Sequence, residues 1–169
     1  IGAGPAGIGA ALALKEVGAR YTIFEREKPF NTIQNFPKAK FIFSEPRQIE
    51  SIGNFWFEDA QKEDLVERWE AALDEKALVI RQPEGVVDIQ RKDGLFTIST
   101  TRGDDNQSHS YRAKRVILAI GRRSAVRMLN IPGEARENVA YTLRDAALHA
   151  GRKVLVIGGG DSAVEAAVA

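Results

Sequence analysis

Residues 1–11 read IGAGPAGIGAA and place Gly2, Gly4 and Gly7 in the spacing G-x-G-x-x-G. In a loop of this kind the first glycine permits a tight turn, and the second lets the backbone approach a pyrophosphate. The third allows the following helix to pack close to its sheet. The first turn of that helix offers unpaired N–H groups and the positive end of its dipole to phosphate. We therefore expect a dinucleotide site here, followed by a helix that is closed by Gly18.

An acidic residue follows this loop at the interval that such a site requires. Residues 21–25, YTIFE, are rich in β-forming side chains and end in Glu25. An acid about twenty residues beyond the glycines accepts hydrogen bonds from ribose hydroxyls. The simpler alternative is a glycine-rich turn with an unrelated surface glutamate, and the combination of motif and spacing argues against it.

A second glycine motif lies near the other end of the chain, in residues 154–167, VLVIGGGDSAVEAA. Gly158, Gly160 and Ala163 give G-x-G-x-x-A after an expected strand at 154–157. One dinucleotide needs one pyrophosphate cradle, so two motifs predict two nucleotide sites. An electron path from nicotinamide to flavin is the economical reason to have both. An unrelated tandem domain, or a second site without its ligand, is the alternative.

Between the two motifs, apolar periodicity and turn residues predict the remaining elements. We expect a loop at 30–51, a helix at 62–76, strands at 78–80 and 111–120, a hairpin of 86–91 with 95–100 that turns at Asp93-Gly94, a solvated loop at 102–110, and a hinge at 131–133. The strand at 111–120 ends in VILAI and is expected to be buried, with Gly121 bringing bare backbone against a cofactor.

Composition excludes several classes of function. The chain has 169 residues, 44% hydrophobic and 28% charged, with a net charge of +1. This balance fits a soluble globular protein without a basic surface for nucleic acid or a membrane. It contains no cysteine and two histidines, so a disulfide or a thiolate or histidine metal cluster is not expected. Because the chain begins within one motif and ends within another, we expect it to be part of a longer protein.

The motifs GAGPAG, FERE, NFP, DGLFTIST, VILAIG, IPGE and GGGDSAVEAA occur in this order and cover nearly the whole chain. In this combination the sequence resembles the thioredoxin reductase-like flavoproteins of the pyridine nucleotide–disulfide oxidoreductase group. The resemblance implies an α/β fold, with a three-layer FAD-binding Rossmann-type domain that carries a β-hairpin or meander insertion. A second Rossmann-type domain for NAD(P) would begin after it. The first segment of the FAD domain, lacking most of its first strand, would span 1–133, and a truncated NAD(P)H domain would span 134–169.

One departure from thioredoxin reductases is decisive. Their Cys-x-x-Cys pair falls between the hinge and the second glycine motif, where residues 142–145 here read TLRD. Because these residues include no cysteine, there is no internal dithiol in that place to which the flavin could pass electrons. The chain therefore resembles the cysteine-free relatives, which include bacillithiol disulfide reductase-like proteins.

The resemblance assigns the cofactor contacts residue by residue. It places the FAD pyrophosphate at the first loop, the adenosine ribose at Glu25, the isoalloxazine near the NFP motif, and the NADPH pyrophosphate at the second loop; NADH is the alternative to NADPH. The residues are Gly2, Gly4, Pro5, Ala6, Gly7, Glu25, Asn35, Phe36, Pro37, Val86 (near adenine), Ala119, Ile120 and Gly121 for FAD, and Gly158, Gly159, Gly160, Asp161, Ser162, Ala163 and Glu165 for NADPH. Glu165 is either a nicotinamide contact or a solvated helix residue. No catalytic residue and no metal ligand are assigned.

The implied function is hydride transfer from NAD(P)H to FAD and onward to an external acceptor, either a small molecule or a small protein. We expect a cytoplasmic enzyme that is independent of nucleic acid and membrane, with a homodimer as one assembly. A flavin monooxygenase is disfavoured because Leu143 and Asp145 stand where its F-x-G-x-x-x-H signature, ending at His149, needs Phe and Gly. A nucleotide-binding redox sensor without turnover is the alternative from another class.

Five further side chains are candidates for a functional site, and most of them have a simpler explanation. Trp69 shares a helical stripe with Leu65 and Leu73, so we expect it in the core, whereas Trp56 is a candidate aromatic of an acceptor site. Arg122 and Arg123 fit a solvated loop better than a phosphate site. His149 has no partner residues that would indicate acid–base chemistry.

Overall fold

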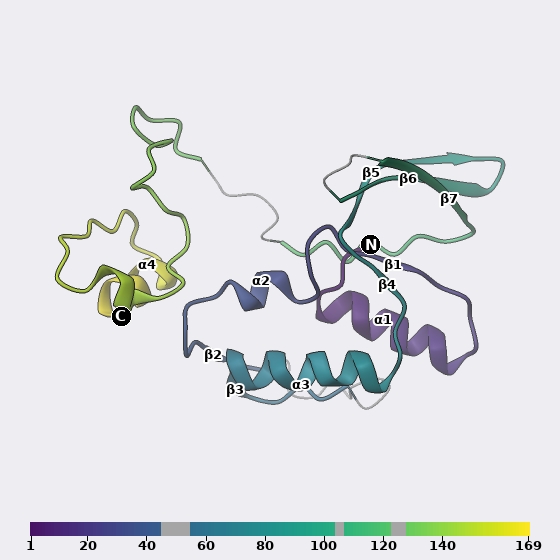
Figure 1. The fold of residues 1–169 in the computed structure, drawn as a ribbon, viewed down its shortest axis with the longest axis horizontal. Helices are drawn as coiled ribbons and strands as arrows, with labels where there is room; N and C mark the ends of the chain where they lie inside the picture. Colours follow the sequence, from purple (N-terminus) through teal and green to yellow (C-terminus); the bar gives the residue numbers. More distant parts are fainter. Residues whose placement is uncertain (45–54, 104–106, 123–127) are drawn as a thin grey trace.

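The computed structural model describes residues 1–44, 55–103, 107–122 and 128–169 (Figure 1). Its helices and strands form a mixed α/β arrangement. In chain order they are α1 (Pro5–Glu16), β1 (Ile23–Phe24), α2 (Asn31–Gln34), β2 (Phe41–Ile42), β3 (Ala60–Gln61), α3 (Lys62–Glu75), β4 (Ile80–Arg81), β5 (Glu84–Lys92), β6 (Leu95–Arg102), β7 (Gln107–Ala113), the 3₁₀ helix η2 (Ala146–His149) and α4 (Asp161–Val168).

Short parallel segments meet at the N-terminus. β1 pairs with β4 in parallel, and the N–H of Gly2 donates to Phe24 O at 2.9 Å, so the first residues lie beside β1. On their other side, the N–H of Ala119 donates to Ile1 O at 2.8 Å, and the N-terminal amine donates to Ile117 O at 2.8 Å. The glycine loop is thus held between β1 and the segment that the sequence predicts to return to the cofactor.

The expectation of a buried strand over 111–120 is wrong in its second half. β7 ends at Ala113, and residues 115–120 form no strand. Leu118 is 63% exposed, and Ile117 and Ile120 are also exposed. Among the described residues, backbone hydrogen bonds join this segment to Ile1, at the edge of the parallel segments, while the side chains of Ile117, Leu118 and Ile120 stay exposed.

The core forms between α1, α3 and an aromatic cluster. Ile8 and Leu12 of α1 are buried with Leu65 and Trp69 of α3, while Phe30 and Phe55 contact the Trp69 ring. The Trp69 indole N–H donates to Trp56 O at 2.7 Å, which satisfies the polar atom that burial would otherwise leave unpaired. The helix predicted over 62–76 and the core position of Trp69 are therefore confirmed.

The hairpin is part of a three-stranded antiparallel meander, β5-β6-β7, which lies on the opposite side of β1 and β4 from α1 in Figure 1. Asp93 (φ 51°) and Gly94 (φ 77°) make its first turn, as a type I′ hairpin requires. The solvated loop expected over 102–110 is wrong in part, because β7 begins at Gln107. Its polar sequence, QSHSYRA, belongs to a strand with alternate residues exposed.

The segment expected to be irregular over 30–51 contains two short elements in its described part. α2 is a single turn, and β2 pairs with β3 antiparallel, with Phe41 opposite Gln61. Elements of two to four residues are too short to leave a periodic pattern in the sequence. Residues 45–51 lie outside the described residues.

The turn at 131–133 is organised by one carboxylate. Glu134 accepts hydrogen bonds from the N–H groups of Leu129 and Asn130, both at 2.6 Å, and from the Tyr141 hydroxyl. The bond to Glu134 raises the pKa of Tyr141 to about 12, because the carboxylate favours the neutral phenol. Whether this turn acts as the hinge between two domains stays a prediction.

The strand expected at 154–157 does not form. Leu155 is 83% exposed, and no backbone hydrogen bond joins these residues to another segment of the described chain. A strand requires a hydrogen-bonded neighbour, and none lies beside this one. The loop and helix that follow are present, and α4 has no buried residue. Among the described residues, no helix is long and apolar enough to cross a membrane.

Candidate dinucleotide-binding site

The fold requires glycine at two of the three positions of the first loop and leaves the third open. Gly2 has φ +98°, and a Cβ there would lie 2.5 Å from Ala119 O. A Cβ on Gly7 would lie 1.9 Å from Gly2 O, so only glycine lets α1 begin this close to the loop. A Cβ on Gly4 would meet nothing within 4 Å, and the Gly4 backbone is extended (φ −79°, ψ −179°).

The open space beside Gly4 is where a dinucleotide would contact the loop. Gly4 is the N-cap of α1, and it has no side chain that could accept from the first N–H groups of the helix. The first N–H groups of α1 therefore remain available to an anion. The residues present fit a bound pyrophosphate. The position that the fold leaves open is Gly4, and the second glycine of this motif is the one at which the backbone approaches the pyrophosphate.

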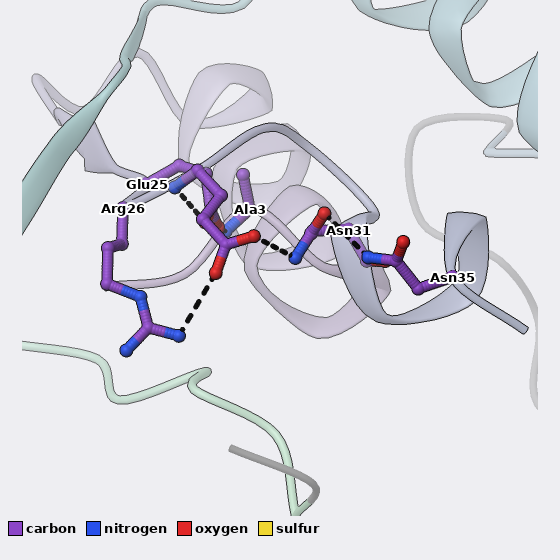
Figure 2. A network of polar contacts seen from close by, with 6 residues as sticks. Ala3, Glu25, Arg26, Asn31 and Asn35 are labelled. Carbon is purple, nitrogen blue, oxygen red and sulfur yellow. Dashed lines mark hydrogen bonds and ion pairs between the residues drawn. The ribbon is translucent and has the colours of Figure 1, made fainter. Parts of the chain in front are cut away.

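Glu25 holds this loop in place. Its carboxylate accepts the N–H of Ala3 at 2.8 Å through Oε2, and the N–H of Glu27 at 3.0 Å through Oε1. Its backbone is fixed as well, since its N–H donates to Arg81 O at 2.9 Å and its carbonyl accepts from Glu84 N at 2.8 Å. The structure thus brings the predicted ribose residue directly against the predicted phosphate loop (Figure 2).

From Glu25 a chain of polar contacts leads to the NFP motif. The Glu27 carboxylate accepts hydrogen bonds from Arg26 Nη2 and from the Asn31 side-chain amide, and Figure 2 shows Asn31 in turn beside Asn35. The Asn35 amide donates to Asn31 Oδ1 at 2.9 Å and to Asn31 O at 2.8 Å. One network therefore connects the residues expected at the two ends of an FAD molecule.

The start of β5 adds a buried acid that the sequence reading missed. Glu84 is 1% exposed and accepts a 2.6 Å hydrogen bond from the Thr100 hydroxyl. Burial opposes its ionisation, but the Thr100 bond, the Tyr111 hydroxyl and the charge of Arg81 together hold the pKa of Glu84 below its usual value. Val86, expected near adenine, is half-buried two residues later. The sequence offered one indication of this residue, because Glu84 stands directly before Gly85 at the start of a strand.

The second loop has a wider geometry than the first. Gly158 has φ +135°, and its hypothetical Cβ would lie 3.4 Å from the Cβ of Ala163, which is ordinary contact. This spacing explains how alanine can take the third motif position here. Gly160 is the N-cap of α4, and a Cβ there would meet nothing within 4 Å.

Glu165 of α4 forms an ion pair with Lys40, with 2.5 Å between Oε2 and Nζ. A pocket of about 280 Å³ lies beside this pair and is lined by Pro37, Phe41, Phe43 and Leu143 together with the end of α4. Glu165 thus contacts the segment that carries the NFP motif. Glu165 was expected either to contact the nicotinamide or to be a solvated helix residue. Its side chain is half-exposed and paired with Lys40, and the nicotinamide contact stays a prediction.

The remaining candidates gain no role. Arg122 and His149 are exposed, Arg123 lies outside the described residues, and Trp56 packs against the core with Arg68 over its ring. No group of three or more His, Cys, Asp or Glu that could hold a metal occurs in the described part of the chain.

Comparison with known proteins identifies the family. The family model described as pyridine nucleotide-disulphide oxidoreductase matches residues 1–169. A ferredoxin–NADP reductase from Ignicoccus hospitalis is 33% identical over 171 residues, covering 99% of this chain and 50% of the relative. Bacilliredoxin reductase Bdr from Bacillus subtilis is 26% identical over 175 residues, covering 99% of this chain and 51% of the relative.

A solved structure agrees with these relatives. The bacillithiol disulfide reductase Bdr from Bacillus cereus superposes with a TM-score of 0.88 at 29% identity, over 99% of this chain and 52% of that one. This match supports a Rossmann-like α/β fold. The chain spans about half the length of the curated relatives it matches. By motif, fold and family model together, the chain belongs to the pyridine nucleotide-disulphide oxidoreductase family.

Proposed function

We propose that the protein containing this chain is an FAD-dependent oxidoreductase that passes a hydride from NADPH to FAD and on to an external acceptor. The observation that carries this proposal is the cradle at Gly4, which is open, extended and braced by Glu25. The second glycine loop and the family membership support a second nucleotide. The relatives' names describe NADP-linked and redoxin-linked reductases.

In this proposal the first loop holds the FAD pyrophosphate through the N–H groups at the start of α1. Glu25 accepts from the adenosine ribose, Val86 lies at the adenine, and residues 35–37 and 119–121 lie along the rest of the cofactor. The flavin, when bound, supplies two-electron chemistry, and the protein supplies orientation and exclusion of water. Residues 158–163 hold the NADPH pyrophosphate, so that 1–133 serve FAD and 134–169 begin the NADPH domain.

The acceptor in this proposal is a small redox protein or a small disulfide-type molecule outside this chain. No cysteine occurs in the 169 residues, so an internal dithiol here cannot take the electrons. The names of the relatives, a ferredoxin reductase and a bacilliredoxin reductase, point to small redox proteins. The same family membership disfavours a monooxygenase.

Anaerobic titration of the full-length protein tests this function. We expect NADPH to bleach the bound flavin at about one two-electron equivalent per flavin, as for a lone flavin. Gly160→Val should prevent reduction by NADPH but leave reduction by dithionite unchanged, because it alters only the second cradle.

Two results would contradict the proposal. Full-length protein that binds no FAD would contradict the whole proposal. A titration end point near two equivalents per flavin, without a further redox centre, would contradict the expectation that the flavin alone accepts the electrons. Flavin that is reduced without turnover of any acceptor would favour the redox sensor.

A further inference from the structure

We propose that Lys62, with its neighbour Glu63, is a positioning residue that clamps residues 34–40 and so fixes the flavin-facing NFP segment. This inference rests on the proposed function for its cofactor, and on the contacts below for the clamp. Neither residue has an assigned role in the FAD or NADPH contacts described above.

Lys62 holds the segment at three points. Its Nζ donates to Gln34 O at 3.1 Å and to Phe36 O at 2.7 Å, while its backbone N–H donates to Lys40 O at 2.9 Å. The two carbonyls that Nζ contacts flank Asn35, which is the C-cap of α2. A single residue at the start of α3 therefore joins both ends of the segment on which Asn35, Phe36 and Pro37 lie.

The ammonium group is well placed for this task because it is largely withdrawn from solvent. The Lys62 side chain is 12% exposed, and a charged donor makes stronger hydrogen bonds to carbonyls than a neutral one. Its charge is compensated by Glu63, whose Oε1 lies 3.5 Å from Nζ. A buried ammonium without such partners would be costly.

Glu63 completes the clamp from the other side. Its Oε1 accepts the N–H of Ala39 at 3.2 Å, at a residue with φ +57°. That left-handed conformation is unfavourable for alanine, so the bond stabilises a turn that the chain would otherwise avoid. Burial opposes its ionisation, but the Ala39 bond and Lys62 hold the pKa of Glu63 below its usual value, so it is a carboxylate at neutral pH.

The clamped segment is also the one that reaches toward the second glycine helix. Lys38 N donates to Arg144 O at 2.8 Å, and Lys40 pairs with Glu165. If residues 34–40 shift, the flavin-facing residues and the contact with α4 shift together. Misplacement of reacting groups by about 1 Å can slow a reaction on the order of a hundredfold.

The test compares Lys62→Met with Lys76→Met in full-length holoprotein. Lys76 caps the other end of α3, and in the described part of the chain its side chain pairs with the neighbouring Glu75. We expect Lys62→Met to increase deuterium uptake across 34–40, to change the visible circular dichroism of the flavin, and to slow its reduction by NADPH on the order of tenfold. Lys76→Met should behave as wild type. Lys62→Arg, which keeps a charged donor, should retain much of the wild-type behaviour in all three measurements.

Wild-type deuterium uptake and visible circular dichroism in Lys62→Met would overturn the clamp while leaving the proposed function intact. If Lys62→Met does not fold, Glu63→Ala decides the matter, because it removes the half-exposed side chain that accepts the Ala39 N–H from outside the core. Faster exchange at Ala39 in Glu63→Ala supports the clamp, and unchanged exchange overturns it. Wild-type protein that lacks FAD would overturn the proposed function, and the deuterium comparison would still test the clamp.

Discussion

The carboxylate of Glu25 accepts the backbone N–H of Ala3 at 2.8 Å, so the residue expected to bind ribose also braces the loop expected to bind phosphate. Both tasks depend on one side chain, which can accept several hydrogen bonds at once when it is ionised. A substitution at Glu25 therefore affects the empty protein as well as its cofactor affinity.

We expect Glu25→Gln to lose one of the two backbone bonds, because the amide nitrogen cannot accept. The free energy of unfolding of the FAD-free protein should fall by about 1–3 kcal/mol. FAD affinity should fall on the order of tenfold, measured by flavin fluorescence. Glu16→Gln, at an exposed position at the end of α1, is the matched control and should change neither quantity.

The glycines of the first loop offer a series that separates folding from binding. Gly4→Val should fold normally, since a Cβ meets nothing there and the backbone is extended, yet FAD affinity should fall at least about tenfold. Gly7→Ala should prevent folding, because its Cβ would lie 1.9 Å from Gly2 O. Gly9→Ala, in open space within α1, should retain the yellow colour and add about 0.5–1 kcal/mol of stability. Flavin binding by Gly4→Val at wild-type affinity would contradict this account of the cradle.

Thr100→Val removes the hydrogen bond to the buried Glu84 carboxylate and should lower the free energy of unfolding by about 1–3 kcal/mol near neutral pH. Glu84 has a depressed pKa when folded, so its stabilising effect is present above its unfolded pKa and is lost as the pH falls through the folded value. The difference between variant and wild type should therefore narrow in acid. Urea melts across this pH range measure it, with Thr97→Val on the same strand as control.

The Tyr141–Glu134 bond can be read directly by ultraviolet titration. Tyr141 should ionise near pH 12 rather than its usual 10.0, and Glu134→Gln should bring the pKa back toward the usual value. Because the folded pKa is raised, the contribution of this bond to the turn is present below pH 10.0 and is lost as the pH rises through about 12. Tyr141→Phe identifies the signal among the three tyrosines. An unshifted titration would show that the two side chains do not meet in solution.

Motifs with a local cause were predictable from the sequence. The glycine loop, the helix at 62–76 and the Asp93-Gly94 turn depend on residues close together in the chain, and each is confirmed. The position of Glu25 was also predictable, because the βα unit has a nearly fixed length. Its bond to Ala3 was not foreseen, although both residues lie in the motif.

Other features depend on contacts between distant segments. Lys62 meets Gln34 and Phe36 only after α3 folds back on α2, and nothing in the local pattern distinguishes Lys62 from a solvated lysine. The apolar run at 154–157 has the composition of a strand, but a strand also needs a neighbour, and composition cannot supply one. The first part of β7, residues 107–110, was predicted as a loop for the opposite reason, since pairing with β6 makes a strand of a polar sequence.

The hydrogen bond between Ala119 N and Ile1 O joins two residues that lie far apart in the sequence and so closes a long loop. The β5-β6-β7 meander, in contrast, pairs strands that follow one another in the chain. Closing a loop of this length costs about 2 kcal/mol more chain entropy than closing one of ten residues. The meander should therefore form early, and the phosphate cradle should be completed late. On the ribosome, Gly2 would gain its contact with Ala119 only after residue 119 has emerged, so the growing chain would assemble its first glycine loop from two segments that are synthesised far apart in time.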